Sequence, residues 1–176
     1  MSAVLPTPHT GHHDHAHDDH HHHAPTGWRR WVFATNHKDI GTLYLVFSFC
    51  MFIIGAFMSV IIRTELATPG LQHVSPEFFN QMTTMHALVM IFGGVMPAFV
   101  GLANWMIPLQ IGAPDMAVPR MNNWASWILP FAFSRLLMSL FLPGGGPAGG
   151  GTMYPPLSLQ GGASVSFMIF AIHMMG

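Results

Sequence analysis

Hydrophobic residues fall into four long runs, separated by short polar or glycine- and proline-rich connections. The first covers residues 40 to 62. As a helix rising ~1.5 Å per residue it would be ~33 Å long, enough to cross a bilayer. The second covers residues 79 to 107, with Gly93, Gly94 and Pro97 inside it, and the third covers residues 123 to 142. The fourth, from residue 163 to the last residue, is too short to span.

This pattern predicts an all-α membrane protein, a transmembrane helix bundle with three complete spans and the start of a fourth. The composition agrees, because 51% of the 176 residues are hydrophobic and 7% are charged, against about 25% charged in soluble domains. The net charge of −1 provides no basic field for nucleic acid. The 15 methionines suit either an irregular apolar ligand or lipid-facing helix surface.

Residues 1–27 have a different composition, with nine histidines between His9 and His23 and three interleaved aspartates. Such a segment cannot bury a core, so it is predicted to be a disordered tail. It could bind Zn, Ni or Cu, or be a polar tail without a metal role. No apolar signal-peptide core is present in it. Residues 28–176 then form the helix bundle.

The basic residues predict an orientation. Four of the six Lys and Arg residues fall on one side of the predicted membrane: Arg29, Arg30, Lys38 and Arg120. Arg63 falls on the other side, so the positive-inside rule favours a cytoplasmic amino terminus. The sixth, Arg135, falls within the third run, where an arginine costs ~2.5–3.5 kcal/mol on insertion scales. No role for Arg135 follows from the sequence.

His86 lies inside the second apolar run, about two helical turns from its start. Intramembrane polar groups usually have a partner. Neutral imidazole is a ligand for haem iron, and helix bundles can hold a macrocycle. A hydrogen bond to a neighbouring helix is the alternative. Arg63, at a similar depth, could donate to a cofactor oxygen or simply anchor the interface.

Two further polar sites lie near the predicted membrane edges. Glu65 with the following bend ATPG offers a carboxylate and loop carbonyls, which could hold a hard cation. Asp115 is the only acidic residue in the connection 104–124, which also contains Asn104 and Asn122. Such residues can hold waters at the mouth of a proton pathway, or they can cap a polar turn.

Five segments, in this order, resemble the amino-terminal part of subunit I of the haem-copper cytochrome c oxidases: NHKDIGTLYL (36–45), IIRTELATPG (61–70), MHALVMIF (85–92), NWMIPLQIGAPDMAVPRMNN (104–123) and MYPPLS (153–158). The resemblance covers about residues 28–176 and excludes the histidine-rich tail. Subunits of that family have about twelve spans, so this chain is expected to be a partial sequence.

The resemblance implies a role for each matching residue. His86 matches the first axial ligand of the low-spin haem. Arg63 matches the arginine that hydrogen-bonds the formyl group of haem a. Asp115 matches the mouth of a proton pathway, and Asn104 and Asn122 match asparagines that line it.

The outer loops carry weaker correspondences. Glu65 and Gly70 match a peripheral calcium or sodium site. His173 matches a family histidine to which no ligand role is assigned. Gly151 stands where the family usually has a tryptophan that helps to hold a haem propionate, so that contact is not expected in this chain.

The identity of the electron donor follows from three positions. Related quinol oxidases place an arginine and an aspartate for quinol on the lipid side of the first helix, where this chain has Ile54 and Met58. A histidine that they carry near the second span is Phe78 here. Cytochrome c is therefore the expected electron source.

The resemblance implies the catalytic subunit of a proton-pumping terminal oxidase in the bacterial inner membrane, working with subunits II and III. It would pass electrons from cytochrome c through haem a to oxygen, giving water. The ligands of the high-spin haem and of copper would lie outside this segment, so the segment alone is not expected to be active. The alternative is a small non-catalytic membrane protein in which His86 and His173 bind one haem and the tail binds metal.

Overall fold

A computed structural model describes residues 27–70 and 72–175. The predicted histidine-rich tail, apart from Gly27, lies outside these residues. The described parts form helices and loops, without strands. The elements are α1 (Trp28–Val32), α2 (His37–Glu65), α3 (Pro76–Leu88), the π-helix η1 (Val89–Val95), α4 (Met96–Ile111), α5 (Pro119–Met138), the 3-10 helix η2 (Ser139–Phe141), α6 (Leu157–Gln160) and α7 (Gly162–Met175).

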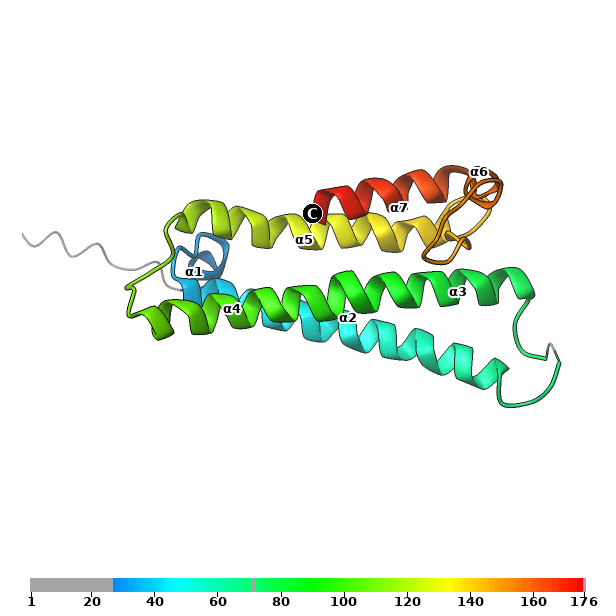
Figure 1. Cartoon of the computed structure of the whole chain (residues 1–176), viewed down its shortest axis with the longest axis horizontal. Helices are drawn as coiled ribbons and strands as arrows, with labels where there is room; N and C mark the ends of the chain where they lie inside the picture. The colour runs from blue at the N-terminus through cyan, green and yellow to red at the C-terminus, as the bar shows by residue number, and fades with distance from the viewer. Residues whose placement is uncertain (1–26, 71, 176) are drawn as a thin grey trace, which may run out of the picture.

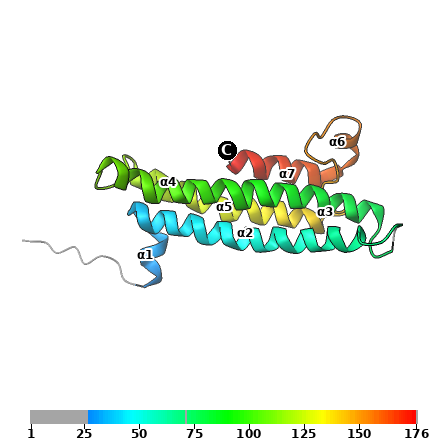
Figure 2. The same ribbon diagram turned by 60° about the horizontal axis from the view of Figure 1, so that its bottom comes forward.

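The long helices lie side by side in two layers (Figures 1 and 2). In one layer α2 packs along the continuous helix α3–η1–α4, and in the other α5 packs along α7. The short α1 and the α4–α5 loop lie at one end, here called the α1 end. The α5–α7 connection with α6 lies at the opposite end, the α6 end.

Three helical stretches are long and apolar enough to cross a membrane: His37–Glu65, Pro76–Ile111 and Pro119–Phe141. The fourth apolar run forms the shorter helix α7. The all-α prediction of three spans and a fourth helix is therefore confirmed, with each span longer than its hydrophobic run. The added turns are polar ends, which hydrophobicity alone does not detect.

Local capping explains where these helices begin and end. The Asn36 side chain accepts the Lys38 backbone N–H at 3.0 Å and caps α2. The Ser75 hydroxyl accepts a backbone N–H at 3.3 Å at the start of α3, and Pro76 follows at a helical position that needs no N–H donor. After α4, Gly112 adopts a left-handed φ of 69°, the usual glycine conformation for a helix end.

The second span contains a π-helix where the sequence has its Gly-Gly pair. Pro97, just beyond η1, has no N–H to donate to the preceding turn. The carbonyl of Gly94, within η1, accepts a hydrogen bond from the buried Ser48 hydroxyl of α2 at 2.5 Å. π-Helical turns within α-helices are frequent at functional sites, and η1 begins three residues after His86.

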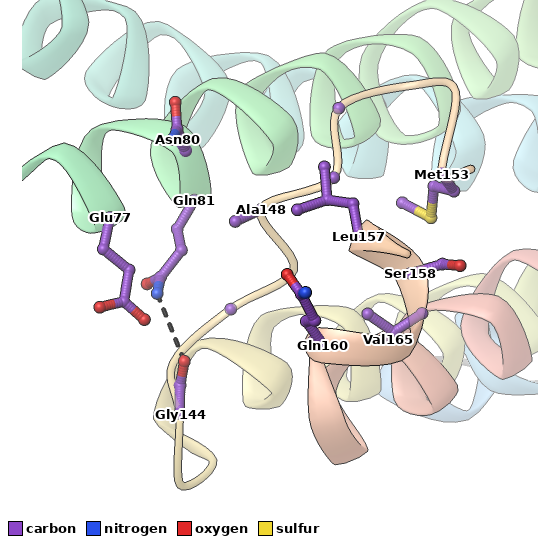
Figure 3. Close-up of a pocket in the computed structure, with 14 residues that line it drawn as sticks. Glu77, Asn80, Gln81, Gly144, Ala148, Met153, Leu157, Ser158, Gln160 and Val165 are labelled. Atoms are coloured by element: carbon purple, nitrogen blue, oxygen red, sulfur yellow. Dashed lines mark hydrogen bonds between the residues drawn. The ribbon is translucent and has the colours of Figure 1, made fainter. Parts of the chain in front are cut away.

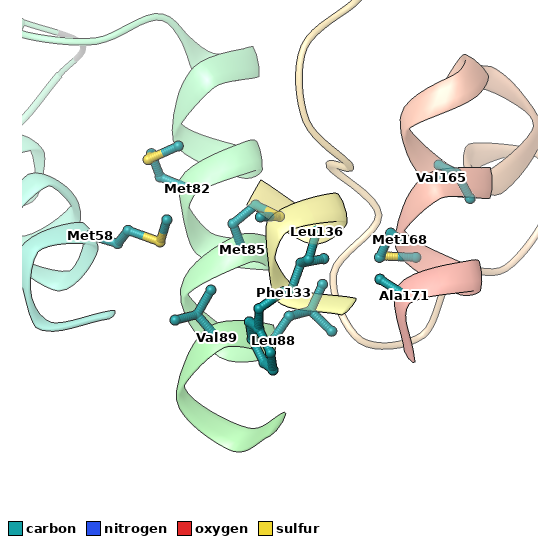
Figure 4. Close-up of a cluster of buried hydrophobic side chains, with 10 residues drawn as sticks. All are labelled: Met58, Met82, Met85, Leu88, Val89, Phe133, Leu136, Val165, Met168 and Ala171. Carbon is teal, nitrogen blue, oxygen red and sulfur yellow. The ribbon is translucent and has the colours of Figure 1, made fainter. Parts of the chain in front are cut away.

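A methionine-rich core joins the two layers at the α6-end half of the bundle (Figure 4). Its buried members come from α2, α3, η1, α5 and α7: Met58, Met82, Met85, Leu88, Val89, Phe133, Leu136, Val165, Met168 and Ala171. Gly93 lets the layers approach, because a Cβ there would lie 2.8 Å from the Phe133 ring and 2.9 Å from the Met51 Cβ. Four of these ten side chains are methionines, so methionine here fills core space and does not only face lipid.

Helix α1 is tied to the start of α2 by charge. The Arg30 guanidinium donates to both Asp39 carboxylate oxygens, at 2.9 and 2.8 Å. The hydrogen bond and the charge of Asp39 raise the pKa of Arg30. From α5, the Asn123 amide donates to the Val32 carbonyl at 2.9 Å. These bonds fix α1, with its exposed Trp28, against the end of the bundle.

Candidate functional site

His86 lies in the last turn of α3 and is half-buried against α2. Its Nδ1 is 2.9 Å from the backbone carbonyl of Gly55. A carbonyl only accepts, so Nδ1 carries a proton in this contact, and in the neutral ring Nε2 keeps its lone pair. No hydrogen bond to Nε2 is formed within the described residues, and that atom is not enclosed. This arrangement would suit a ligating histidine, because such a histidine commonly has its other ring nitrogen held by a backbone carbonyl.

Gly55 also lies against η1. A Cβ at position 55 would lie 2.5 Å from the sulfur of Met90, so a larger residue there would require the Met90 side chain to move. The glycine thus lies on α2, and the histidine that contacts its carbonyl lies on the next long helix, α3.

Arg63 lies in the last turn of α2 with an exposed side chain. It is eight residues beyond Gly55, a rise of about 12 Å along the helix. It forms no ion pair with any carboxylate in the described parts of the chain. Its guanidinium is therefore available to an acceptor beside the bundle at the α6 end.

Asp115 occupies the α4–α5 loop at the opposite, α1 end. Its Oδ1 accepts the Met116 backbone N–H at 2.8 Å and the His37 backbone N–H at 3.1 Å. The side chain of Asp115 is 37% exposed, whereas that of His37 is 6% exposed. The carboxylate therefore joins the loop to the start of α2 and remains partly exposed to solvent.

The His37 ring lies against this carboxylate. Its Nδ1 is 3.3 Å from Asp115 Oδ1, an ion-pair separation when the imidazole is protonated. The Nδ1 and Oδ1 atoms are not oriented for a hydrogen bond. Both ring nitrogens of His37 are therefore buried without a hydrogen-bond partner. Buried polar atoms of this kind are normally satisfied by ordered water.

Asn104 and Asn122 are brought together from α4 and α5. The Asn122 amide donates to Asn104 Oδ1 at 2.6 Å, and the buried Asn104 donates to the Val100 carbonyl at 2.9 Å. No direct hydrogen bond joins this pair to Asp115 in the described residues. The three predicted residues thus fall into two groups at the same end of the bundle: Asp115, which lies beside the unpredicted His37, and the pair of amides.

Glu65 is buried at the end of α2, where the following loop wraps around it. One carboxylate oxygen accepts the Gln72 backbone N–H at 2.9 Å. The other accepts the N–H groups of His73 and Val74, at 2.8 and 3.0 Å. The adjacent pocket of about 450 Å³ is lined by Glu65 and residues 66–70, including Gly70 at a φ of 99°. The first role of this carboxylate is therefore to hold the loop.

We expect Glu65→Gln to open this loop, because the amide cannot accept all three N–H groups. Hydrogen bonds to a charged group contribute about 1.5–3 kcal/mol each. Amide hydrogen exchange at residues 72–74 should accelerate at least about tenfold in the purified membrane protein, measured by mass spectrometry. Glu77→Gln, at an exposed carboxylate in the first turn of α3, is the matched control and should leave these amides unchanged. Equal exchange in both variants would contradict this role.

A larger pocket of about 640 Å³ lies at the α6 end between α3 and the glycine-rich loop (Figure 3). Gln81 reaches from α3 toward the Gly144 carbonyl, with Nε2 at 3.4 Å. The Thr84 hydroxyl accepts the Gly150 backbone N–H at 3.0 Å. Gly151, where a tryptophan was expected, is exposed and supplies no side chain to this region.

Residues 39–176 match the family described as cytochrome C and quinol oxidase polypeptide I. The chain belongs to this family. Cytochrome c oxidase subunit 1 of Mytilus edulis is 44% identical over 154 residues, covering 85% of this chain and 28% of that protein. Probable cytochrome c oxidase subunit 1-alpha of Streptomyces coelicolor is 47% identical over 129 residues, covering 73% and 22%. Cytochrome c oxidase subunit 1 of Corynebacterium glutamicum is 45% identical over 138 residues, covering 77% and 24%.

This oxidase polypeptide I chain spans about a quarter of the length of the curated relatives it matches. The resemblance to subunit I is thus confirmed, and the chain is a segment of an integral membrane protein. The matched range contains every site residue predicted from the sequence. His37 and the histidine-rich tail precede it.

Two features of this oxidase polypeptide I segment were missed or misplaced from sequence. His37 was quoted within NHKD but given no role, although it lies against Asp115. The available signal was a histidine in the polar first turn of the first helix, directly after the capping residue Asn36. Met58, expected on the lipid side of the first helix, is instead buried in the core at 6% exposure, and Ile54 packs against that core. These positions remain apolar, but the expected lipid-facing location is wrong for Met58.

Proposed function

We propose that this chain is the amino-terminal part of the catalytic subunit of a haem-copper terminal oxidase, which passes electrons from cytochrome c to oxygen and pumps protons. Membership of the polypeptide I family supports this proposal, as do relatives named cytochrome c oxidase subunit 1. The contact between His86 and Gly55 is the single observation that carries it.

His86 would hold the iron of the low-spin haem, which the resemblance gives as haem a. The Gly55 carbonyl holds the Nδ1 proton and orients the ring, so that Nε2 can face the iron. Bound there, the haem iron would accept and pass on single electrons. Arg63, about 12 Å further along α2, would donate to an oxygen at the edge of the macrocycle.

Asp115 would be the mouth of a proton pathway. Its partly exposed carboxylate can exchange protons with solvent, and the buried His37 ring lies directly behind it. The Asn122–Asn104 pair extends polar groups toward the membrane interior. The buried atoms without protein partners at this end, including Asn123 Oδ1, are positions that ordered water would satisfy.

The membrane orientation proposed is with the α1 end in the cytoplasm of a bacterial-type cell. Arg29, Arg30, Lys38 and Arg120 lie at that end, and Arg63 lies at the other. This imbalance is what the positive-inside rule requires. Protons would then be taken up at Asp115 from the cytoplasm, against a field that costs ~2.3 kcal/mol per charge for each 100 mV.

The remaining parts of the enzyme would lie outside this segment. These are the ligands of the high-spin haem and copper, subunits II and III, and the docking site for cytochrome c. A peripheral calcium or sodium ion would use a remaining lone pair of Glu65 with loop carbonyls such as that of Gly70. Among the described residues no group of three or more His, Cys, Asp or Glu forms a ready-made metal cluster.

The direct test is to isolate the membrane complex that contains this chain from native membranes. We expect a low-spin haem a signal in its reduced-minus-oxidised spectrum, and oxygen consumption when reduced cytochrome c is added. Intact mass measured on the same sample shows whether the chain is part of a longer subunit. A complex that contains this chain without haem, or that does not consume oxygen, would refute the proposal.

A further inference from the structure

The histidine-rich tail is a feature of the chain that the proposed oxidase function does not use. It carries nine of the 13 histidines and, apart from Gly27, lies outside the described residues. The match to the oxidase family begins at residue 39, so the tail also precedes the part that carries the family's chemistry. Its role is therefore argued from its own side chains and from the place where it joins the fold.

The histidines of the tail form two groups of four in the sequence, with His9 ahead of them. The segment GHHDHAH (11–17) has four histidines around one aspartate, and DDHHHH (18–23) has four histidines after two aspartates. Imidazole is a preferred ligand of Zn²⁺, Cu²⁺ and Ni²⁺. Protein-bound Zn²⁺ is usually four-coordinate, so each group has enough imidazoles to complete the shell of one ion.

The charge of the tail favours a bound cation. The tail has three aspartates and no lysine or arginine, and an imidazole is mostly neutral at pH 7. The neutral form is the one that ligates a metal, and nearby carboxylates can orient it by accepting its other N–H. A tail that only paired its aspartates with basic residues at the α1 end would gain nothing from nine neutral imidazoles.

The described residues at the α1 end do not offer a metal site of their own. No group of three or more His, Cys, Asp or Glu gathers in that part of the chain. Both oxygens of Asp39 accept hydrogen bonds from Arg30, and the His37 ring is buried. The ligands of an ion held here would therefore come from the tail itself.

We propose that residues 11–23 bind two divalent transition-metal ions of the Zn²⁺ class, one in each group of four histidines. His23 is four residues from Gly27, a reach of at most about 14 Å. Helix α1, which follows Gly27, is fixed to the bundle through Asp39 and Asn123. The second ion is thereby held near the α1 end, and this metal binding does not depend on the oxidase reaction.

The first experiment counts zinc in the complete membrane complex, purified without metal-affinity chromatography and dialysed with Zn²⁺ and a large excess of Mg²⁺. Mg²⁺ prefers oxygen ligands, so it displaces only weakly held zinc. The parent protein should bind two more zinc ions per chain than a variant with serine at all eight positions. Replacing the four histidines of residues 11–17, or the four of residues 18–23, should remove one ion each.

The matched control replaces His73 and His173, two exposed histidines outside the tail, by serine, and it should keep both ions. Equal zinc in the parent and the eightfold variant would overturn the proposal. Loss of both ions when either group alone is replaced would also overturn it, because that result requires shared sites.

The second experiment separates a native site from adventitious binding. Protein purified from native membranes without added metal should already carry more zinc, nickel or copper than the eightfold variant. No excess of any of the three metals would mean an adventitious ion only and would overturn the proposal. The element found in excess identifies which member of the class the tail takes.

The haem spectrum and oxygen consumption of the same samples keep this inference separate from the proposed function. Both should be unchanged in the eightfold variant, because the tail precedes the family match. Two zinc ions bound by a complex without oxidase activity would refute the proposed function and support the tail site. Full oxidase activity without tail-dependent zinc would do the reverse.

Discussion

Replacing His86 by alanine in the complete subunit is expected to remove the low-spin haem signal. The Gly55 carbonyl fixes the Nδ1 proton at 2.9 Å, so Nε2 is the one basic nitrogen that this ring offers. Only an imidazole at position 86 can donate a hydrogen bond to the Gly55 carbonyl with one nitrogen and offer a second nitrogen to the haem iron. We expect the low-spin band to fall about tenfold or more relative to protein, and oxygen consumption to fall with it.

The control for this variant is His173→Ala. The His173 Nδ1 lies 2.9 Å from the carbonyl of Ile169 in its own helix, so its ring is held by local structure on an exposed face. The low-spin band should survive this change. If His86→Ala kept the band, the assignment of His86 as a ligand would be wrong. If both variants lost the band equally, the result would instead favour a haem held between the two histidines.

The bundle itself could be predicted from hydrophobic runs, because nothing but a helix can cross lipid with its backbone groups satisfied in a single segment. The helix ends could not be placed, since α2 begins at His37 and α3 at Pro76, in polar turns outside the runs. The caps Asn36 and Ser75 are visible in the sequence, but they compete with many similar residues. The π-helix depends on how Gly93 and Gly94 pack, and no periodicity reveals it.

The candidate site was predicted residue by residue only through resemblance, because the physical signal of each residue was ambiguous. His86 alone could equally have been a structural histidine. Its partner, the Gly55 carbonyl, is 31 residues away in the sequence and is a backbone group that no side-chain pattern encodes. Similarly, Asp115 and His37 are 78 residues apart and meet only because α4 returns to the start of α2.

Asp115→Asn is expected to slow proton uptake strongly while leaving the haem spectrum unchanged. An asparagine keeps the size of the side chain, and its oxygen can still accept the N–H groups of His37 and Met116. It cannot carry a proton between solvent and the interior. Losing a positioned acid–base group typically costs about 10²-fold or more. The measurement is proton release per electron, with oxygen consumption, in vesicles containing the complete enzyme.

Asp39→Asn is the matched control for this variant, because Asp39 is a carboxylate at the same end of the bundle. Both of its oxygens accept hydrogen bonds from Arg30, so it ties α1 to the start of α2. That variant should keep normal proton release per electron. Normal release in Asp115→Asn would instead show that protons enter elsewhere. Reduced proton release in both variants would point to general damage at the α1 end. Reduced proton release in Asp115→Asn alone is the result that a carboxylate at the pathway mouth requires.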